Sequence, residues 1–153
     1  MREIKFRGKR LDNNEWAHGL LTVIEQLPIG KIAEIRHCEQ SDGNMIETNT
    51  LVKANTVGQY TVHNDCNDVE IYEGDIVTDN VSNGKPFGVI TWHIDGYFYI
   101  DEYFGNLPQY YQKCIPLGEM LRMETKGHPI EIKVIGNAFD NPELLEKEGS
   151  EEC

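Results

Sequence analysis

The chain has 153 residues, of which 39% are hydrophobic and 26% are charged, a composition typical of a folded globular protein rather than a disordered one. No apolar run approaches the roughly 20 residues of a membrane-spanning helix, and the basic start lacks the apolar stretch of a secretory signal, so we expect no membrane insertion and a cytoplasmic location. Fourteen Lys and Arg against 26 Asp and Glu give a net charge of −12, which disfavours direct binding of nucleic acid because that affinity depends on basic side chains.

The first ten residues depart from this acidic balance, with five basic residues and one acidic residue. Over residues 4–7 the order Ile-Lys-Phe-Arg alternates apolar and basic side chains, which predicts a half-buried strand over 2–7. A turn cluster at 12–14 separates it from residues 16–25, which are rich in aromatic and β-branched side chains. We therefore expect a hairpin, and we interpret the basic residues as a solvated strand face.

Residues 31–38 and 45–52 flank the turn-forming residues 41–44, which predicts a second hairpin. The three-residue spacing of Ile32 and Ile35 leaves a helix as the alternative for 31–38.

The middle of the chain alternates short strands with loops. Residues 54–61 (ANTVGQYT) are expected to form a turn or one helical turn, and residues 63–68 an acidic loop. Residues 71–77 (IYEGDIV) predict a strand interrupted at Gly74, which adopts positive φ at little cost.

The strongest hairpin signal is the Asp-Gly pair at 95–96, because it separates two apolar, aromatic-rich runs at 88–94 and 97–100. Further on we expect a short helix near 117–122 and a last strand over 129–135.

Asn141-Pro142-Glu143 is expected to open a short C-terminal helix, with Asn141 as its N-cap. The predicted fold is mainly β (β-rich α+β): a small curled β-barrel or sandwich, SH3-like in its turn pattern, with an N-terminal hairpin region and this helix. We expect one domain over 1–153, with a subdivision into 1–54, 55–146 and a mobile tail at 147–153.

Cysteine spacing predicts reduced thiols, because the four cysteines are scattered and no CxxC pair exists. They are Cys38, Cys66, Cys114 and Cys153.

One loop gathers potential metal ligands. The candidates are His63, Asp65, Cys66, Asp68 and Glu70, with Cys114 or His93 as additional ligands from elsewhere. A structural zinc site normally uses two closely spaced ligand pairs, and the loop also fails the EF-hand spacing. A solvated acidic loop is therefore the favoured interpretation, and a metal-assisted hydrolase is the weaker alternative.

Other catalytic templates are missing from the sequence. There is no GxSxG motif and no phosphate-binding GxxxxGK[ST] or GxGxxG loop. Cys38 and His37 are neighbours on an expected strand, so they point to opposite faces. We expect no catalytic, cofactor-binding or metal-binding residues and no cofactor.

An aromatic cluster is the densest feature of the sequence. It comprises Trp92, Tyr97, Phe98, Tyr99, Tyr103, Phe104, Tyr110 and Tyr111. A stacking platform for bases or sugars normally includes basic residues, and 88–111 contains none. We favour a hairpin that buries one face, with its exposed part serving as a subunit interface.

Several blocks, taken in order, resemble the YopX protein family of bacteriophages and prophages. They are MREIKFRGKR, ANTVGQYT, IYEGDIV, GVITW and VIGNAFDNPELLE. The stretch before IYEGDIV departs from the family's usual threonine-glycine-leucine, and residues 27–50 look variable. The resemblance implies a small β-rich phage protein that self-associates, and it carries over no catalytic residue.

The leading hypothesis is therefore a phage or prophage accessory protein that acts by protein–protein contact and forms a homo-oligomer, with a host or phage protein as partner. A second hypothesis is an acidic mimic of nucleic acid that binds a host protein. Its motivation is the charge of −12, including six acids and no base between Asp65 and Asp79.

Overall fold

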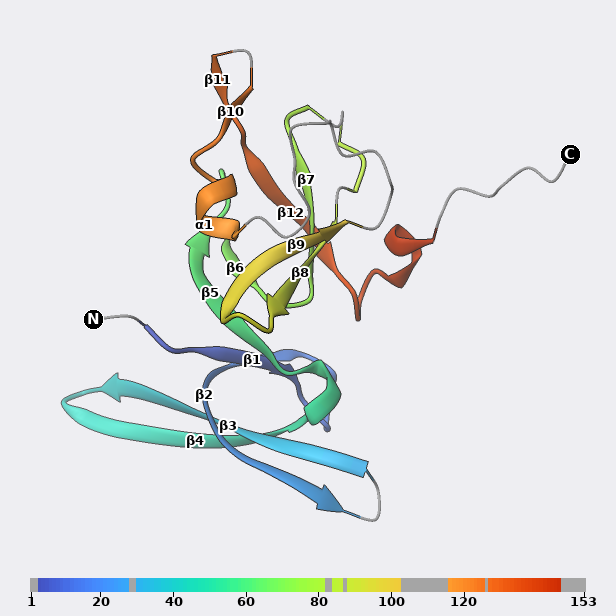
Figure 1. Cartoon of the computed structure of the whole chain (residues 1–153). Coiled ribbons are helices and arrows are strands. Elements are labelled where there is room, and N and C mark those ends of the chain that lie inside the picture. The colour runs from blue at the N-terminus through green and yellow to red at the C-terminus, as the bar shows by residue number, and fades with distance from the viewer. Residues whose placement is uncertain are drawn as a thin grey trace, which may run out of the picture. The chain divides into compact units, whose positions relative to one another are not determined.

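A computed structural model describes residues 3–27, 30–81, 84–86, 88–102, 116–125 and 127–146. The chain forms two compact units, Met1–Val62 and His63–Cys153, whose strands are labelled in Figure 1. Each unit has its own buried core. The expected mainly β class is confirmed, since 60% of the structure is strand and 9% is helix. The described strands form antiparallel sheets without a closed barrel.

The first unit is built on one curled antiparallel sheet. Its elements are β1 (Phe6–Lys9), β2 (Trp16–Leu27), β3 (Gly30–Ser41), β4 (Asn44–Lys53), the 3₁₀ helix η1 (Ala54–Thr56) and β5 (Gly58–Asn64), which runs through the boundary between the units. The strands are hydrogen-bonded in the order β4-β3-β2-β1-β5, and this sheet continues from β5 to a sixth strand, β6 (Glu70–Tyr72). Both predicted hairpins are present, although the first strand is Phe6–Lys9 rather than the expected 2–7. The helix alternative for 31–38 is wrong, because that segment pairs with β2 on one edge and β4 on the other.

The core of unit 1 is small and lies on one face of this sheet. Ala33, Ile35 and Val52 are almost fully buried there. Gly8 allows β1 to pack against them, since a Cβ at that position would lie 2.8 Å from Cγ2 of Val52. A bridge between Arg10 and Val52 brings the end of β1 beside the base of β4 and curls the sheet.

The second unit contains a four-stranded antiparallel sheet in the order β12-β7-β8-β9. Its elements are β6 (Glu70–Tyr72), β7 (Asp75–Asp79), β8 (Gly88–His93), β9 (Tyr97–Glu102), α1 (Leu117–Met120), the ribbon of β10 (Glu124–Thr125) and β11 (His128–Pro129), β12 (Ile132–Asn137) and the 3₁₀ helix η2 (Pro142–Leu145). In the described parts of both units, no helix is long and apolar enough to cross a membrane.

The core of unit 2 is formed by strand residues and by the one-turn helix α1. Its buried members are Ile71, Val77, Ile90, Phe98, Ile100, Leu117, Met120, Ile130 and Ile132. The Asp-Gly hairpin is confirmed, with Gly96 at φ 90° and its N–H donating to the carbonyl of His93 at 2.9 Å. The predicted short helices near 117 and 142 are also present.

Asn141 occupies the expected N-cap position of η2, with Pro142 in the first turn. Its side chain, however, makes no cap bond to η2, and its Oδ1 accepts from the backbone N–H of Asn137 at 3.4 Å. The expected tail at 147–153 lies outside the described residues.

Replacing Ile90 by Ala should lower the free energy of unfolding by about 2–5 kcal/mol, because it leaves a cavity in the unit 2 core. Ile94, which is 93% exposed on the same hairpin, is the matched control, and Ile94→Ala should change stability by less than about 0.5 kcal/mol. Urea unfolding of both variants compares them. Equal losses would contradict the assignment of Ile90 to the core.

Candidate functional site

Asp65, the centre of the predicted ligand loop, is a buried structural residue. Its Oδ1 accepts hydrogen bonds from the backbone N–H groups of Asn67 at 2.7 Å and Val69 at 2.9 Å. Its Oδ2 accepts from the backbone N–H of Val134 in β12 at 3.0 Å. Both carboxylate oxygens therefore hold the loop in shape and attach it to the sheet.

The other candidate ligands of the loop are not brought together with Asp65. Glu70 accepts a hydrogen bond from the hydroxyl of Tyr72 at 2.8 Å, and Asp68 accepts one from the side-chain amide of Asn64 at 2.7 Å. Among the described residues, no three His, Cys, Asp or Glu side chains form a group that could hold a metal ion. The proposed additional ligand Cys114 lies outside the described residues.

His63 and Cys66 differ from the rest of the loop in their ionisation. Burial, with a smaller contribution from nearby Arg122, lowers the pKa of His63. The imidazole packs on α1, where a Cβ at Gly118 would lie 3.0 Å from Nε2. Cys66 is exposed, but partial desolvation of its sulfur, followed by the carboxylates of Asp65 and Glu131, raises the pKa of its thiol. A thiol that stays protonated is a poor nucleophile and a poor metal ligand.

Two further acidic side chains between residues 65 and 79 also accept hydrogen bonds from backbone N–H groups. Asp75, which is 1% exposed, accepts from the N–H of Tyr72 at 2.7 Å. The buried Asp79 accepts from the N–H of Val81 at 3.0 Å. Three of the six acids between 65 and 79 are therefore buried in turns, and the stretch does not present six carboxylates to solvent.

The IYEGD turn places Gly74 between two other segments of unit 2. Gly74 has φ 85°, donates its N–H to the carbonyl of Ile90 and accepts from the N–H of Ala138, both at 2.9 Å. Positive φ is strained for most other residues. The turn thus links β8 to the segment after β12.

The basic residues of β1 lie over aromatic rings, which corrects the expected solvated face. The guanidinium of Arg7 is 4.6 Å from the ring centroid of Trp16, and the ammonium of Lys9 is 5.5 Å from the same centroid. Just before β1, the ammonium of Lys5 lies 5.0 Å from the ring centroid of Tyr60. Because Arg7 is buried in this arrangement, cation–π packing replaces part of its solvation.

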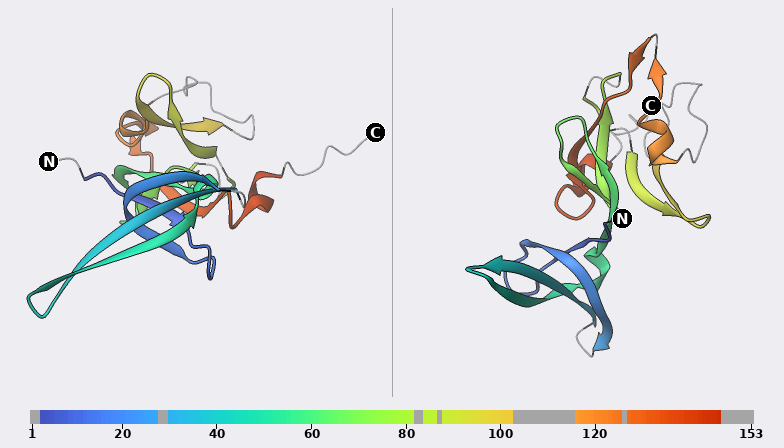
Figure 2. Two further views of the ribbon diagram at one scale, coloured as in Figure 1. Left: turned by 90° about the horizontal axis from the view of Figure 1, so that it is seen from below. Right: turned by 90° about the vertical axis from the view of Figure 1, so that its left-hand side faces the viewer.

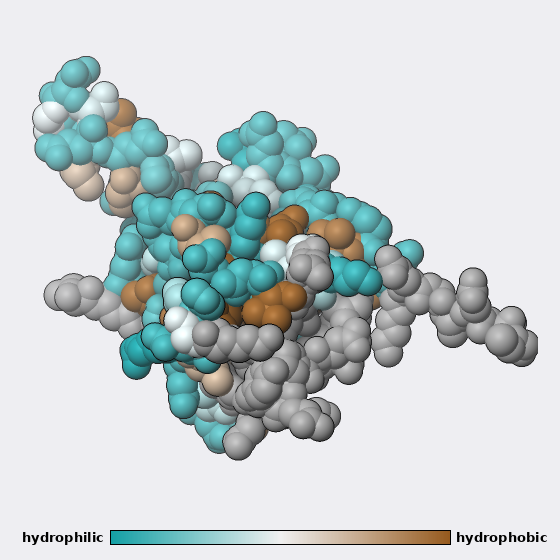
Figure 3. Space-filling view, turned by 90° about the horizontal axis from the view of Figure 1, so that it is seen from above, coloured by the Kyte–Doolittle hydropathy of each residue, from teal (hydrophilic) through white to brown (hydrophobic). Residues whose placement is uncertain are grey.

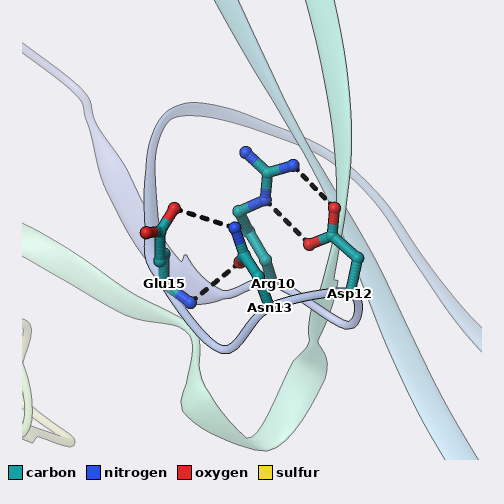
Figure 4. A network of polar contacts seen from close by, with 4 residues as sticks. All are labelled: Arg10, Asp12, Asn13 and Glu15. Atoms are coloured by element: carbon teal, nitrogen blue, oxygen red, sulfur yellow. Dashed lines mark hydrogen bonds and ion pairs between the residues drawn. The ribbon is translucent and has the colours of Figure 1, made fainter.

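Arg10, at the end of this basic segment, is engaged in the β1–β2 turn (Figure 4). Its Nε and Nη2 donate to the two carboxylate oxygens of Asp12 at 2.9 and 2.7 Å. This fork raises the pKa of Arg10 and lowers that of Asp12. Asn13 and Glu15 complete the turn, since Asn13 Nδ2 donates to Glu15 Oε2 at 2.8 Å.

The β8–β9 hairpin confirms that the aromatic cluster buries one face. Phe98 is in the core and meets Trp92 edge to face, with ring centroids 4.7 Å apart. On the opposite face His93 stacks on Tyr97 at 4.6 Å. At the end of the hairpin Trp92 remains 42% exposed beside Ile94. Tyr103, Phe104, Tyr110 and Tyr111 lie outside the described residues.

The sequence predicts the β3–β4 hairpin but not its long projecting part. β2 pairs with β3 only as far as Arg36, whereas β3 and β4 stay paired to Ser41 and Asn44. Residues 37–48, named here the β3–β4 arm, are all exposed and extend from unit 1 (Figures 1 and 2). The missing alternation of apolar and polar residues in 37–44 was the available signal, because a strand without a buried face has no such pattern.

The chain is similar to one known protein family over most of its length: the sequence model of the YopX protein family matches residues 5–146. No curated protein matches the chain. Among solved structures, the crystal structure of protein EF1440 from Enterococcus faecalis is similar, with 22% sequence identity and a TM-score of 0.49 over 95% of this chain and 100% of that one.

Replacing Asp65 by Asn should destabilise the chain by about 1–3 kcal/mol, because an amide NH₂ then faces one of the three backbone N–H donors. Asp68→Asn is the matched control. Asp68 sits at φ 64°, a conformation that Asn tolerates, so its loss should stay below about 1 kcal/mol. Thermal unfolding followed by circular dichroism measures both. An unchanged Tm in Asp65→Asn would contradict the structural role of Asp65.

His63 should make the folded chain less stable at acidic pH. Its pKa in the folded chain lies below the ordinary value of 6.5, so at acidic pH the unfolded chain binds more protons than the folded one. The free energy of unfolding should therefore fall as the pH drops from about 6.5 through the pKa of the folded state. Arg122→Gln should raise the pKa of His63, since a neighbouring positive charge is removed. NMR titration of the His63 ring tests both statements, and a His63 pKa at or above 6.5 in the unaltered chain would refute them.

Proposed function

Because the chain belongs to the YopX family, we propose that it is a non-enzymatic accessory protein of phage or prophage origin that acts by protein–protein contact and associates with copies of itself. The single observation that carries this proposal is the exposed aromatic and aliphatic end of the β8–β9 hairpin. Trp92 is 42% exposed and Ile94 is 93% exposed at the end of this two-stranded element.

The side chains that could have supported catalysis have structural roles that favour this proposal. Asp65, Asp75 and Asp79 accept backbone hydrogen bonds, and the Cys66 thiol has a raised pKa. A general base or nucleophile needs an accessible group with a pKa suited to proton transfer. The three aspartates instead use their hydrogen-bonding capacity to hold turns.

The hairpin end has the composition of a contact between like subunits. Large aromatic side chains are enriched at protein interfaces and charged ones are depleted at their centres. Between Gly88 and Ile100 the only Asp, Glu, Lys or Arg is Asp95, so two copies of this end can approach with little like-charge repulsion. On the face shown in Figure 3, hydrophobic areas are set in a mainly hydrophilic surface.

Analytical ultracentrifugation should show the unaltered chain as a multiple of its 17.5 kDa mass, and Trp92→Ser/Ile94→Ser should shift it to the single-chain mass. The reason is that the substitutions remove the apolar contact area of the interface. Met45→Ser/Ile46→Ser, which removes two exposed apolar side chains from unit 1, is the control and should leave the mass unchanged. A single-chain mass for the unaltered protein at every concentration would sink the self-association proposal.

A second candidate function, the acidic mimic of nucleic acid, is favoured by the distribution of charge between the units. Residues 1–62 carry eight basic and eight acidic residues, or 8 − 8 = 0, whereas residues 63–153 carry six basic and eighteen acidic residues, or 6 − 18 = −12. The whole acidic excess thus belongs to unit 2. Mimicry would require this excess to face a basic site on a host protein.

Pull-down from nuclease-treated host lysate at low and high salt tests the mimic. A host protein recovered in stoichiometric amount at low salt and lost at high salt is the expected result, because exposed charge pairs are screened by salt. Recovery that does not change with salt would count against mimicry.

A further inference from the structure

The β3–β4 arm has a backbone edge that no described strand covers. β4 is the last strand in the order of its sheet, and along residues 44–50 its pairing among the described strands is with β3 alone. At the base of the arm, the carbonyl of Leu51 accepts a hydrogen bond from the N–H of Leu11 at 3.0 Å. The backbone of Leu51 therefore points away from β3.

This bond also fixes the direction of the backbone groups farther along β4. In an antiparallel strand, alternate residues direct both their N–H and C=O groups to the same neighbour. Met45, Glu47 and Asn49 have the same parity as Leu51, so their N–H and C=O groups point to the open edge. Three consecutive pairs of donors and acceptors are thus available for another strand.

The open edge lacks the features that usually prevent strand addition. Natural sheets protect an edge with proline, lysine or a bulge. Residues 44–50 contain neither Pro nor Lys, and ten consecutive pairs join β3 to β4 without a register shift. The arm is therefore a regular template onto which an extended segment can be added.

The side chains along this edge indicate what kind of segment fits. One face of the β4 edge carries Met45, Glu47 and Asn49, and the other carries Ile46, Thr48 and Thr50. Met45 and Ile46 are 68% and 50% exposed. β-branched and apolar residues of an added strand would pair with the second row, whereas basic residues would lie over Met45 with their stems and reach Glu47 with their charges.

Charge distinguishes between a second copy of the chain and a different partner. Residues 37–48 contain Glu39, Asp42 and Glu47 but no Lys or Arg. Glu47 is at the middle of the open edge, so two copies paired about its centre would place one Glu47 against the other, which is destabilising. A basic segment gains from the same three carboxylates.

We propose that the open edge of β4 takes up an extended segment of another protein, with alternating basic and apolar residues, as an added antiparallel strand. This inference rests on the proposed function of protein–protein contact and names the chemistry of the partner. It uses unit 1, whereas the proposed self-association uses the β8–β9 hairpin of unit 2.

The test uses the full chain and a labelled, end-capped peptide of about seven alternating Lys and Val residues, the length of the open edge. Its matched control has the same sequence with N-methyl groups on the lysine amides, which keep the charge but cannot donate to β4. Fluorescence anisotropy should show the unmethylated peptide binding at least about tenfold more tightly. Hydrogen exchange should show new protection at the amides of Met45, Glu47 and Asn49.

Glu47→Pro removes an outward N–H without removing a bond between β3 and β4, because proline is tolerated where the N–H faces away from the ladder. It should weaken peptide binding by about tenfold, whereas Glu47→Gln, which keeps the N–H, should weaken it by only about threefold. Asn49→Pro is the second variant if Glu47→Pro disturbs the arm, and hydrogen exchange at Thr48 reports whether the arm is intact.

Equal binding of the two peptides, or unchanged binding by both proline variants with an intact arm, would overturn the proposal. Protection of Met45, Glu47 and Asn49 that rises with protein concentration in the absence of peptide would also overturn it, because the occupant would then be a second copy. Trp92→Ser/Ile94→Ser should bind the peptide normally. Loss of self-association and loss of strand addition are therefore separate results.

Discussion

The organisation of unit 2 depends on short side chains that satisfy the backbone N–H groups of its turns. Asp65 is the central case, because its two oxygens accept three backbone hydrogen bonds and join the loop after β5 to β12. Within the IYEGD turn, Asp75 accepts from the backbone N–H of Tyr72 at 2.7 Å. Asn137 accepts from the N–H groups of Phe139 and Asp140 at 3.0 and 2.9 Å. A small β-rich unit has many turns and few helices, so its buried backbone groups need such partners.

This use of acids changes the meaning of the charge in the sequence. A run of carboxylates suggests a metal site or an anionic surface, yet a buried carboxylate that accepts backbone hydrogen bonds is available for neither role. The basic residues of β1 show the same effect with the opposite sign, since Arg7 and Lys9 lie over the ring of Trp16. In both places a charged side chain interacts with a neighbouring group of the protein, a backbone N–H or an aromatic ring. From the composition alone, these side chains would be expected to face solvent or a ligand.

The two proposed contact surfaces differ in the kind of interaction that they offer. The end of the β8–β9 hairpin presents Trp92 and Ile94 with a single nearby carboxylate, and such a surface gains from excluding water. The β3–β4 arm presents unpaired backbone groups with Glu47 at their centre, and such an edge gains from hydrogen bonds and opposite charge. The two proposals thus assign an apolar contact to one unit and a polar, directional contact to the other.

The amino-acid sequence by itself determined the β class, the hairpins and the family, because period-two alternation, an Asp-Gly turn and blocks such as IYEGDIV are local signals. It determined the turn at Gly74 for the same reason. The tertiary structure alone decided which acids are buried, since Asp65 reaches Val134 across 69 residues. It also decided where β2 leaves β3 at Arg36. That point creates the β3–β4 arm, and strand pairing between distant residues has no local pattern from which to predict it.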